Sequence, residues 1–271
     1  QKSGRRYRRF LRPAQAEGHG GKGGEKLTMR IWSISDIGLV RHENQDACQT
    51  MLIGEYTAAV VCDGMGGTAG GTVASHLAVQ TYREHLEANL RSRMTMEQLK
   101  EVSGFAIAAA NEAIRRRGQE DASIRRMGTT LVAAVIRGED VLISNVGDSR
   151  AYLLSESGIR QISKDHSLVE SMVEQGNITQ EQAKKHPSRN LITRALGPEE
   201  TVRDDEFAHK WRQGDYLLLC TDGLVNTVSD QELLFEIVHT DDPEHCLQRL
   251  VNISVSRGAP DNVTAILIQN I

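Results

Sequence analysis

The chain has 271 residues, of which 39% are hydrophobic and 25% charged, an ordinary balance for a globular protein. Its formal net charge of −4 is unevenly distributed, because residues 1–30 carry nine Lys/Arg against two Asp/Glu and the remaining body is strongly acidic. An acidic body with only 4% aromatic residues, and without a long apolar stretch, excludes a general nucleic-acid binder and a membrane protein, so neither partner is expected.

The first 28 residues are basic and then Gly-rich, a composition typical of a disordered leader or linker. A basic run can also bind RNA or acidic lipid, but a linker, or a segment not native to the domain, is the simpler interpretation. Met29 opens the first strand-like run, so the catalytic domain is expected to cover residues 29–271.

Apolar runs and helical periodicity predict groups of strands and helices after Met29. The expected strands cover residues 31–35, 56–62, 129–138, 141–147, 151–155, 159–163, 201–209, 215–220 and 262–269. The expected helices cover residues 69–90, 95–117, 229–239 and 243–257. Strands in meanders and helices in pairs favour an α+β fold over a repeating βαβ chain.

Four cysteines stand far apart at Cys48, Cys62, Cys220 and Cys246, without zinc-ligand spacing. No disulfide framework is visible, and two of them lie inside apolar runs, where a buried free thiol is the simplest interpretation. This pattern favours a reducing, cytoplasmic location.

Aspartates stand at the ends of several apolar strands. Asp63 and Asp222 each follow such a run and precede a glycine, Asp148 follows another, and Asp261 comes just before the last strand. A single Asp-Gly pair is more often a turn than a ligand, but several buried strands that end in acid suggest one shared cleft. Converging carboxylates would be costly without cations, and oxygen-only ligands favour Mg²⁺ or Mn²⁺.

Eight short motifs occur in an order that resembles the metal-dependent protein phosphatase family, also called phosphatase 2C, and its compact bacterial branch in particular. They are SDIGLVRHENQD (35–46), DGMGG (63–67), GTT (128–130), GDSR (147–150), SKDHS (163–167), TRALG (193–197), TDG (221–223) and APDNVT (259–264). The resemblance implies a four-layer α-β-β-α sandwich of two antiparallel sheets flanked by helix pairs. It also implies a flap insert at about residues 165–200.

The resemblance further implies a binuclear Mn²⁺ or Mg²⁺ centre, with a possible third ion. Asp63 resembles the carboxylate that bridges both metals, and the carbonyl of Gly64 resembles a ligand of the second. Asp222 and Asp261 resemble further ligands of the first metal. Asp148, together with Asp222, resembles the ligand of a weaker third metal.

Other motif residues are expected to act around these ions. Arg41 resembles the phosphate clamp, since its planar guanidinium suits two phosphate oxygens. Asp46 and Asp36 are expected to orient metal-bound waters. Met65 stands where many eukaryotic members carry a histidine that is a candidate general acid, and His42 is a conceivable substitute, so the acid stays unassigned.

Supporting and substrate-contacting roles are also expected elsewhere. Thr129 and Ser149 are expected to support strands rather than touch substrate. The flap is expected to contact substrate, and its basic residues could meet acidic phosphopeptides, although a solvated surface is the simpler interpretation; they are Lys184, Lys185, His186 and Arg189.

The sequence thus predicts an enzyme that hydrolyses phosphoserine and phosphothreonine in proteins through metal-activated water. We expect a monomer whose partners are phosphorylated proteins, opposing a serine/threonine kinase and acting on that kinase's substrates. Two alternatives remain: a non-catalytic phosphoprotein-binding module, and a phosphatase dedicated to one anti-sigma-type partner.

Overall fold

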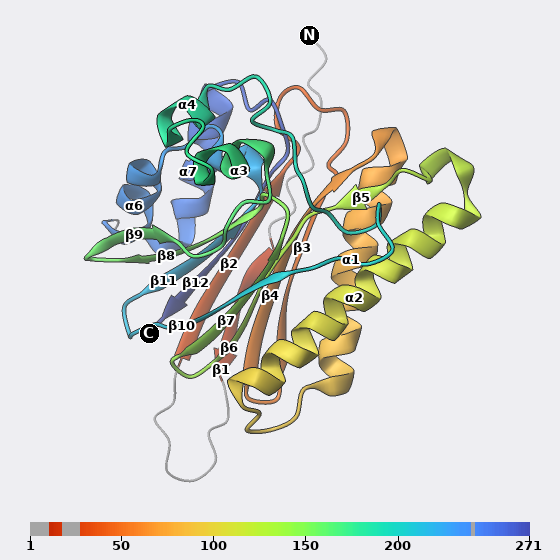
Figure 1. Ribbon diagram of the computed structural model, residues 1–271. Helices are drawn as coiled ribbons and strands as arrows, with labels where there is room; N and C mark the ends of the chain where they lie inside the picture. Colours follow the sequence, from red (N-terminus) through yellow and green to blue (C-terminus); the bar gives the residue numbers. More distant parts are fainter. Residues whose placement is uncertain (1–10, 18–27, 240–241) are drawn as a thin grey trace.

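Two antiparallel sheets packed face to face form the centre of the molecule (Figure 1). The computed structural model describes residues 11–17, 28–239 and 242–271. The first sheet contains, in spatial order, β1 (Leu11–Glu17), β2 (Thr28–Asp36), β12 (Val263–Asn270), β11 (Tyr216–Cys220), β8 (Arg150–Ser155) and β9 (Gly158–Gln161). The second contains β10 (Asp205–Lys210), β7 (Asp140–Val146), β6 (Leu131–Arg137), β4 (Tyr56–Met65) and β3 (Asp46–Ile53), with β5 (Gly128–Thr129) attached to β4.

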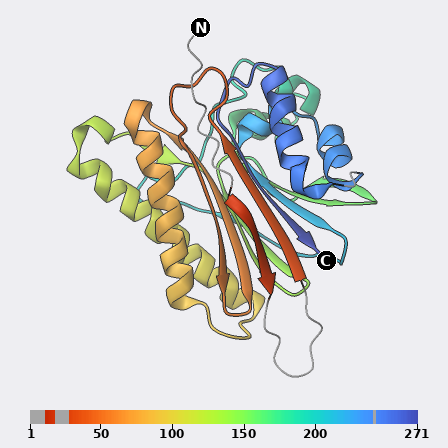
Figure 2. The same ribbon diagram turned by 180° about the vertical axis from the view of Figure 1, so that it is seen from behind.

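Helices cover the outer face of each sheet (Figures 1 and 2). The second sheet is covered by α1 (Gly67–Asn89) and α2 (Met96–Glu120), and the first by α6 (Asp230–Val238) and α7 (Cys246–Ser256). The shorter helices are α3 (Leu168–Glu174), α4 (Gln180–Lys184), α5 (Asp222–Val225), η1 (Ala122–Ile124) and η2 (Pro243–His245). The order of layers is helix, sheet, sheet, helix, which confirms the expected α-β-β-α fold.

The central strands are apolar throughout because both of their faces are buried. In β4, Val60 and Cys62 pack toward α1 and α2, whereas Ala59 and Val61 pack into the core between the two sheets. Strand β11 is shared between two cores in the same way. The charged Asp63 comes near the end of β4, after its buried apolar run.

Three elements differ from the sequence-based expectation. Leu11–Glu17, placed in a leader without structure, forms β1 and pairs with β2 from Leu11↔Ser33 to Glu17↔Thr28; residues 1–10 and 18–27 lie outside the described residues. Strand β3 was missed because its sequence DACQTMLI mixes polar and apolar residues. The short helix α5 begins at Asp222 itself, so this aspartate starts a helix directly after its strand.

The other general expectations concern cysteines and membranes. All four cysteines are free thiols, with Cys48 half-buried and the other three buried, as expected. Among helices in the described part of the chain, none is both long and apolar enough to cross a membrane.

Candidate active site

Most of the residues singled out from the sequence line one pocket of about 500 Å³. They are Arg41, Asp63, Gly64, Asp148, Asp222 and Asp261. Met65 and His42 line it as well. The two residues expected to support the ligands, Asp36 and Asp46, are buried and are not part of the pocket wall.

The main chain of Asp63 is held by two threonines. The Asp63 N–H donates to Thr130 Oγ1 (2.9 Å), and Thr129 Oγ1 donates to the Asp63 carbonyl (2.8 Å). The hydroxyls of Thr130 and Ser149 share a hydrogen bond of 2.7 Å. All three polar side chains are buried, so they fix the strand and leave the Asp63 carboxylate to the pocket.

Gly64 allows the start of α1 to approach β4 directly. A Cβ at this position would lie 2.1 Å from the Gly71 carbonyl oxygen and 2.7 Å from that of Gln45. Any side chain would therefore separate α1 from the strand. The close approach leaves the Gly64 main chain in the wall of the pocket.

Asp222 and Asp261 are brought together by a second close backbone approach. A Cβ on Gly223 would lie 1.9 Å from the Asn262 carbonyl oxygen, so α5 rests against the segment that carries Asp261. Asn226 Nδ2 donates to Asp222 Oδ2 (3.0 Å), while Asp222 Oδ1 is buried without a hydrogen-bond partner. That free carboxylate oxygen is therefore available to a ligand.

Arg41 lies over the acidic pocket and is paired with Asp261. Its Nη2 donates to Asp261 Oδ2 at 2.7 Å, and its side chain is 51% exposed. This hydrogen bond, together with the charges of Asp261, Asp63 and Asp222, raises the pKa of Arg41. The predicted phosphate clamp is thus next to the predicted metal ligands, bonded to one of them.

The loop that carries Arg41 is held by buried side chains. Asp36 accepts a hydrogen bond from Gly38 N (2.9 Å), and Leu39 N donates to the Ala259 carbonyl (3.0 Å). A Cβ on Gly38 would lie 2.2 Å from the Asp261 carbonyl oxygen, so the loop rests directly on the Asp261 segment. Asp36 therefore shapes the loop, while its predicted role toward metal-bound waters stays a prediction.

Asn262 is a site residue that the sequence analysis did not single out. Its Nδ2 donates to the carbonyls of Ile37 (2.9 Å) and Glu43 (3.0 Å), and its Oδ1 accepts from Gln45 N (2.8 Å). The side chain is 4% exposed. It joins the Arg41 loop to the last strand. The signal for this role in the sequence is weak: a polar amide directly before a buried strand.

Asp46 lies directly across β3 and β4 from Asp63. Thr221 Oγ1, at the end of β11, donates to Asp46 Oδ2 (3.0 Å), so the two sheets are joined at this point. Asp46 Oδ1 is buried without a hydrogen-bond partner. Burial raises the pKa of Asp46 to about 7, and the charges of Asp222 and Asp261 add to the rise.

The pKa values of three further carboxylates, Asp63, Asp148 and Asp222, are raised as well. Burial, followed by the charge of Asp46, holds the pKa of Asp63 well above its usual range. Burial and then the charge of Asp222 raise the pKa of Asp148 to about 8. The pKa of Asp222 is raised by burial and by Asp261. The pocket therefore concentrates acidic side chains, and among its described lining residues Arg41, beside Asp261, is the cation that faces them.

These observations fit divalent cations. The donor set is oxygen only, which suits Mg²⁺ or Mn²⁺, and Oδ1 of Asp46 and Oδ1 of Asp222 are buried without hydrogen-bond partners. Within the described ranges, no three His, Cys, Asp or Glu side chains are already grouped as a metal site.

The segment expected to be a flap is attached to the site at both ends. Thr129 and Leu196 exchange main-chain hydrogen bonds (3.0 and 2.9 Å), and at the other end His166 N donates to the Gly147 carbonyl (2.9 Å). Asn190 and Ile192 are its contributions to the pocket wall. The four basic residues predicted as possible substrate contacts do not line the pocket.

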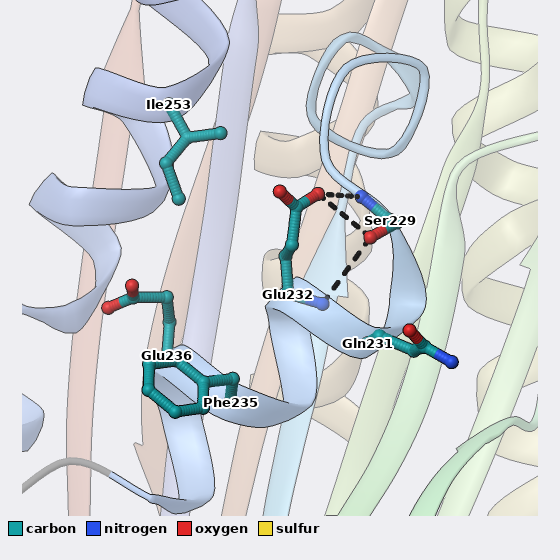
Figure 3. A pocket seen from close by; sticks show the side chains of 6 residues that line it. All are labelled: Ser229, Gln231, Glu232, Phe235, Glu236 and Ile253. Atoms are coloured by element: carbon teal, nitrogen blue, oxygen red, sulfur yellow. Dashed lines mark hydrogen bonds between the residues drawn. The ribbon is translucent and has the colours of Figure 1, made fainter.

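A second hollow of about 500 Å³ lies beside α6 (Figure 3). Its two acids are already bonded within the chain. Glu232 accepts from Ser229 and from Arg257, and Glu236 accepts from Arg249 Nε (2.7 Å). This arrangement caps and joins helices and gives no sign of catalytic chemistry.

Comparison with known proteins agrees with this geometry. Residues 41–253 match the family model described as Protein phosphatase 2C. The serine/threonine phosphatase stp of Listeria monocytogenes is 35% identical over 240 residues, covering 87% of this chain and 93% of that protein. The S. agalactiae serine/threonine phosphatase structure has a TM-score of 0.84 at 30% identity, over 90% of this chain and 100% of that one. The PstP catalytic domain in complex with two manganese ions has a TM-score of 0.77 at 33% identity, over 91% of this chain and 100% of that one.

The fold and the acid-lined pocket, taken with these matches, define a metal-dependent protein phosphatase. The chain belongs to the protein phosphatase 2C family, and its relatives are bacterial. The resemblance found in the sequence is therefore confirmed, whereas the role of each site residue stays a prediction.

Proposed function

We propose that the protein hydrolyses phosphoserine and phosphothreonine in proteins at the pocket that contains Asp63, Asp222 and Asp261. The supporting observation is that burial raises the pKa values of Asp63, Asp148 and Asp222, while one oxygen each of Asp46 and Asp222 is buried without a hydrogen-bond partner, at the ends of strands from both sheets. Relatives named as serine/threonine phosphatases support the choice of substrate.

The carboxylates and Gly64 would hold two Mn²⁺ or Mg²⁺ ions, and Asp148 with Asp222 a weaker third. When bound, such ions supply an activated water and stabilise charge on the transferring phosphoryl group. The chain's own part is to hold rigid carboxylates with their main chain fixed, as Thr129 and Thr130 do for Asp63.

Arg41 would change partner during binding. When Asp261 turns to a cation, the guanidinium loses its carboxylate partner and can donate to two phosphate oxygens instead. The guanidinium is half-exposed and already lies at the pocket, so this change requires only side-chain movement. Met65 lines the pocket and cannot donate a proton, so the leaving alkoxide takes its proton from another group.

We further propose that residues 29–271 are the catalytic domain, that 165–200 is its flap, and that the protein is a cytoplasmic monomer opposing a serine/threonine kinase. The pocket wall contributed by Asn190 and Ile192 supports the flap assignment. The presence of all expected metal aspartates in one place argues against a non-catalytic binding module.

Hydrolysis of a phosphothreonine peptide tests the function. The wild type with Mn²⁺ or Mg²⁺ should turn over, whereas EDTA or Asp222→Asn should abolish turnover; Asp121→Asn, the same change at an aspartate outside the pocket, is the matched control. Full activity under chelation would refute the metal centre. A wild type that binds the peptide but is inert with both metals would support the binding module. A panel of unrelated phosphopeptides separates a broad enzyme from one dedicated to a single partner.

A further inference from the structure

A polar cluster around a buried histidine lies at the base of the flap, outside the pocket wall. Its members, here called the His166 cluster, are His166, Arg194 and Asp205. They come from the start of the flap, its end, and the first residue of β10. Arg194 Nη1 donates to Asp205 Oδ1 (2.8 Å), and His166 Nε2 lies 3.3 Å from Asp205 Oδ2 and 2.9 Å from Arg194 Nη1.

His166 also holds the turn that precedes Asp148. Gly147 N donates to His166 Nδ1 (3.0 Å), and His166 N donates to the Gly147 carbonyl (2.9 Å). Gly147 has φ +105°, and a Cβ there would lie 2.6 Å from Thr130 Cγ2. The turn therefore lies between Thr130 and His166, and a side chain at position 147 would not fit there.

These contacts fix the state of the imidazole. A main-chain N–H can only donate, so Nδ1 accepts from Gly147 N and the proton of the neutral ring sits on Nε2. The two hydrogens of Arg194 Nη1 are used by Asp205 Oδ1 (2.8 Å) and the Arg203 carbonyl (3.0 Å), so the proton on Nε2 is directed to Asp205 Oδ2 at 3.3 Å. Burial lowers the pKa of His166, and the neighbouring Arg194 lowers it further while Asp205 raises it. The neutral ring thus uses one nitrogen for the Gly147 turn and the other for the cluster.

The same ring is attached to the flap. Thr193 N donates to the His166 carbonyl (2.8 Å), next to Arg194 in the chain. One residue earlier, Ile192 reaches the pocket wall. Displacement of this end of the flap would therefore be transmitted through Arg194 and His166 to Gly147.

We propose that His166 is a positioning residue that couples the flap to Asp148. Nδ1 sets the direction of the Asp148 carboxylate by holding Gly147, and Nε2 joins the same ring to the flap through Arg194 and Asp205. The proposal rests on the proposed function in one respect, namely that Asp148 holds the weaker cation.

Two conservative variants separate the two contacts. In His166→Asn, the side-chain oxygen falls near the position of Nδ1 and can accept from Gly147 N, but the link to Asp205 is lost. In His166→Gln, the amide nitrogen falls near Nε2 and can donate to Asp205, but the acceptor for Gly147 is lost. Calorimetric Mn²⁺ titration and peptide kinetics are measured for both, with Asp148→Asn as the reference for loss of the weak site.

The glutamine variant should weaken the weak Mn²⁺ site roughly 10- to 100-fold, as loss of a residue that orients a metal ligand does. Its kcat should fall while KM stays close to that of the wild type. The asparagine variant should keep its Mn²⁺ affinity within about twofold, and its KM for the peptide should rise. Asp205→Asn, at the more exposed end of the cluster, should raise KM in the same way.

The proposal would be overturned if the two His166 variants had the same Mn²⁺ affinity and the same kcat and KM, and differed from the wild type in a lower Tm alone. His166 would then have a structural role. If either variant fails to fold, unchanged kinetics in Asp205→Asn would also refute the link to the flap. Because Mn²⁺ titration needs no turnover, a wild type without phosphatase activity would refute the proposed function and still leave the coupling measurable.

Discussion

Replacement of Asp46 by asparagine tests whether the buried carboxylates destabilise the protein when no cation compensates them. Burial and neighbouring charges raise the pKa of Asp46 from its ordinary 3.8 to about 7. A carboxyl whose pKa rises on folding stabilises the folded state fully below its unfolded pKa, and this contribution is lost as the pH rises through the folded value. At ~1.4 kcal/mol per pH unit, the free energy of unfolding of the metal-free wild type should fall by ~3 kcal/mol between about pH 5 and about pH 7 because of Asp46.

Urea unfolding in EDTA at several pH values between about 5 and 8 measures this loss. The variant keeps an oxygen to accept from Thr221 Oγ1, and its new amide donor replaces a partnerless oxygen at a cost that does not depend on pH. The quantity to compare is therefore the fall in unfolding free energy between about pH 5 and about pH 7. This fall should be smaller in Asp46→Asn than in the wild type by ~3 kcal/mol. Asp121→Asn is the matched control, because hydrogen bonds from Ser123 lower the pKa of Asp121 and keep its titration below the interval.

Parallel stability curves for the wild type and Asp46→Asn would refute the reasoning, since they would show that Asp46 is ionised in the folded state throughout. Mn²⁺ supplies a second check. Each cation that binds only the folded state adds ~2.7 kcal/mol at a concentration of about 100 times its Kd. The stabilisation by Mn²⁺ should therefore be greatest at high pH, where protons no longer compensate the carboxylates.

Three further substitutions have defined outcomes. Gly223→Ala places a Cβ 1.9 Å from the Asn262 carbonyl oxygen; the displaced α5 should lower the Tm by several degrees and abolish peptide turnover. Arg41→Ala should lower kcat/KM for a phosphothreonine peptide roughly 10- to 100-fold, the effect of a lost charged hydrogen bond, in steady-state assays. Asn262→Ala removes three hydrogen bonds to the Arg41 loop and should cost ~2–4 kcal/mol in urea unfolding.

Each of these has an outcome that would contradict it. A wild-type Tm in Gly223→Ala would mean that α5 does not rest on the Asn262 segment. Unchanged kcat/KM in Arg41→Ala, with Arg257→Ala as a control arginine outside the pocket, would remove Arg41 from phosphate binding. Equal loss of stability in Asn262→Ala and in the exposed Asn252→Ala would show that the buried amide does not hold the loop.

The parts of the fold that follow from local pattern were predictable. The run that ends at Cys62 and the run that ends at Cys220 are apolar because both faces of each strand are buried, and the acid that follows is conspicuous for that reason. Strand β3 has no such pattern, since it is the edge strand beyond β4 and alternates less sharply. Which strands share a sheet was not predictable from the pattern: β2 pairs with β12 at the far end of the chain, and local periodicity carries no information about that partner.

The same distinction applies inside the site. Asp63 and Asp222 could be selected because each terminates a buried run, a property of a few adjacent residues. Asn262 could not be selected, because its importance comes from three main-chain groups between Ile37 and Gln45, more than 200 residues away. A buried amide with all of its hydrogen-bonding groups used is rigid, and here it determines where Arg41 stands relative to Asp261. The acids of the pocket could therefore be recognised in the sequence, whereas their alignment with Arg41 depends on the side chain of Asn262, whose contacts are distant in the chain.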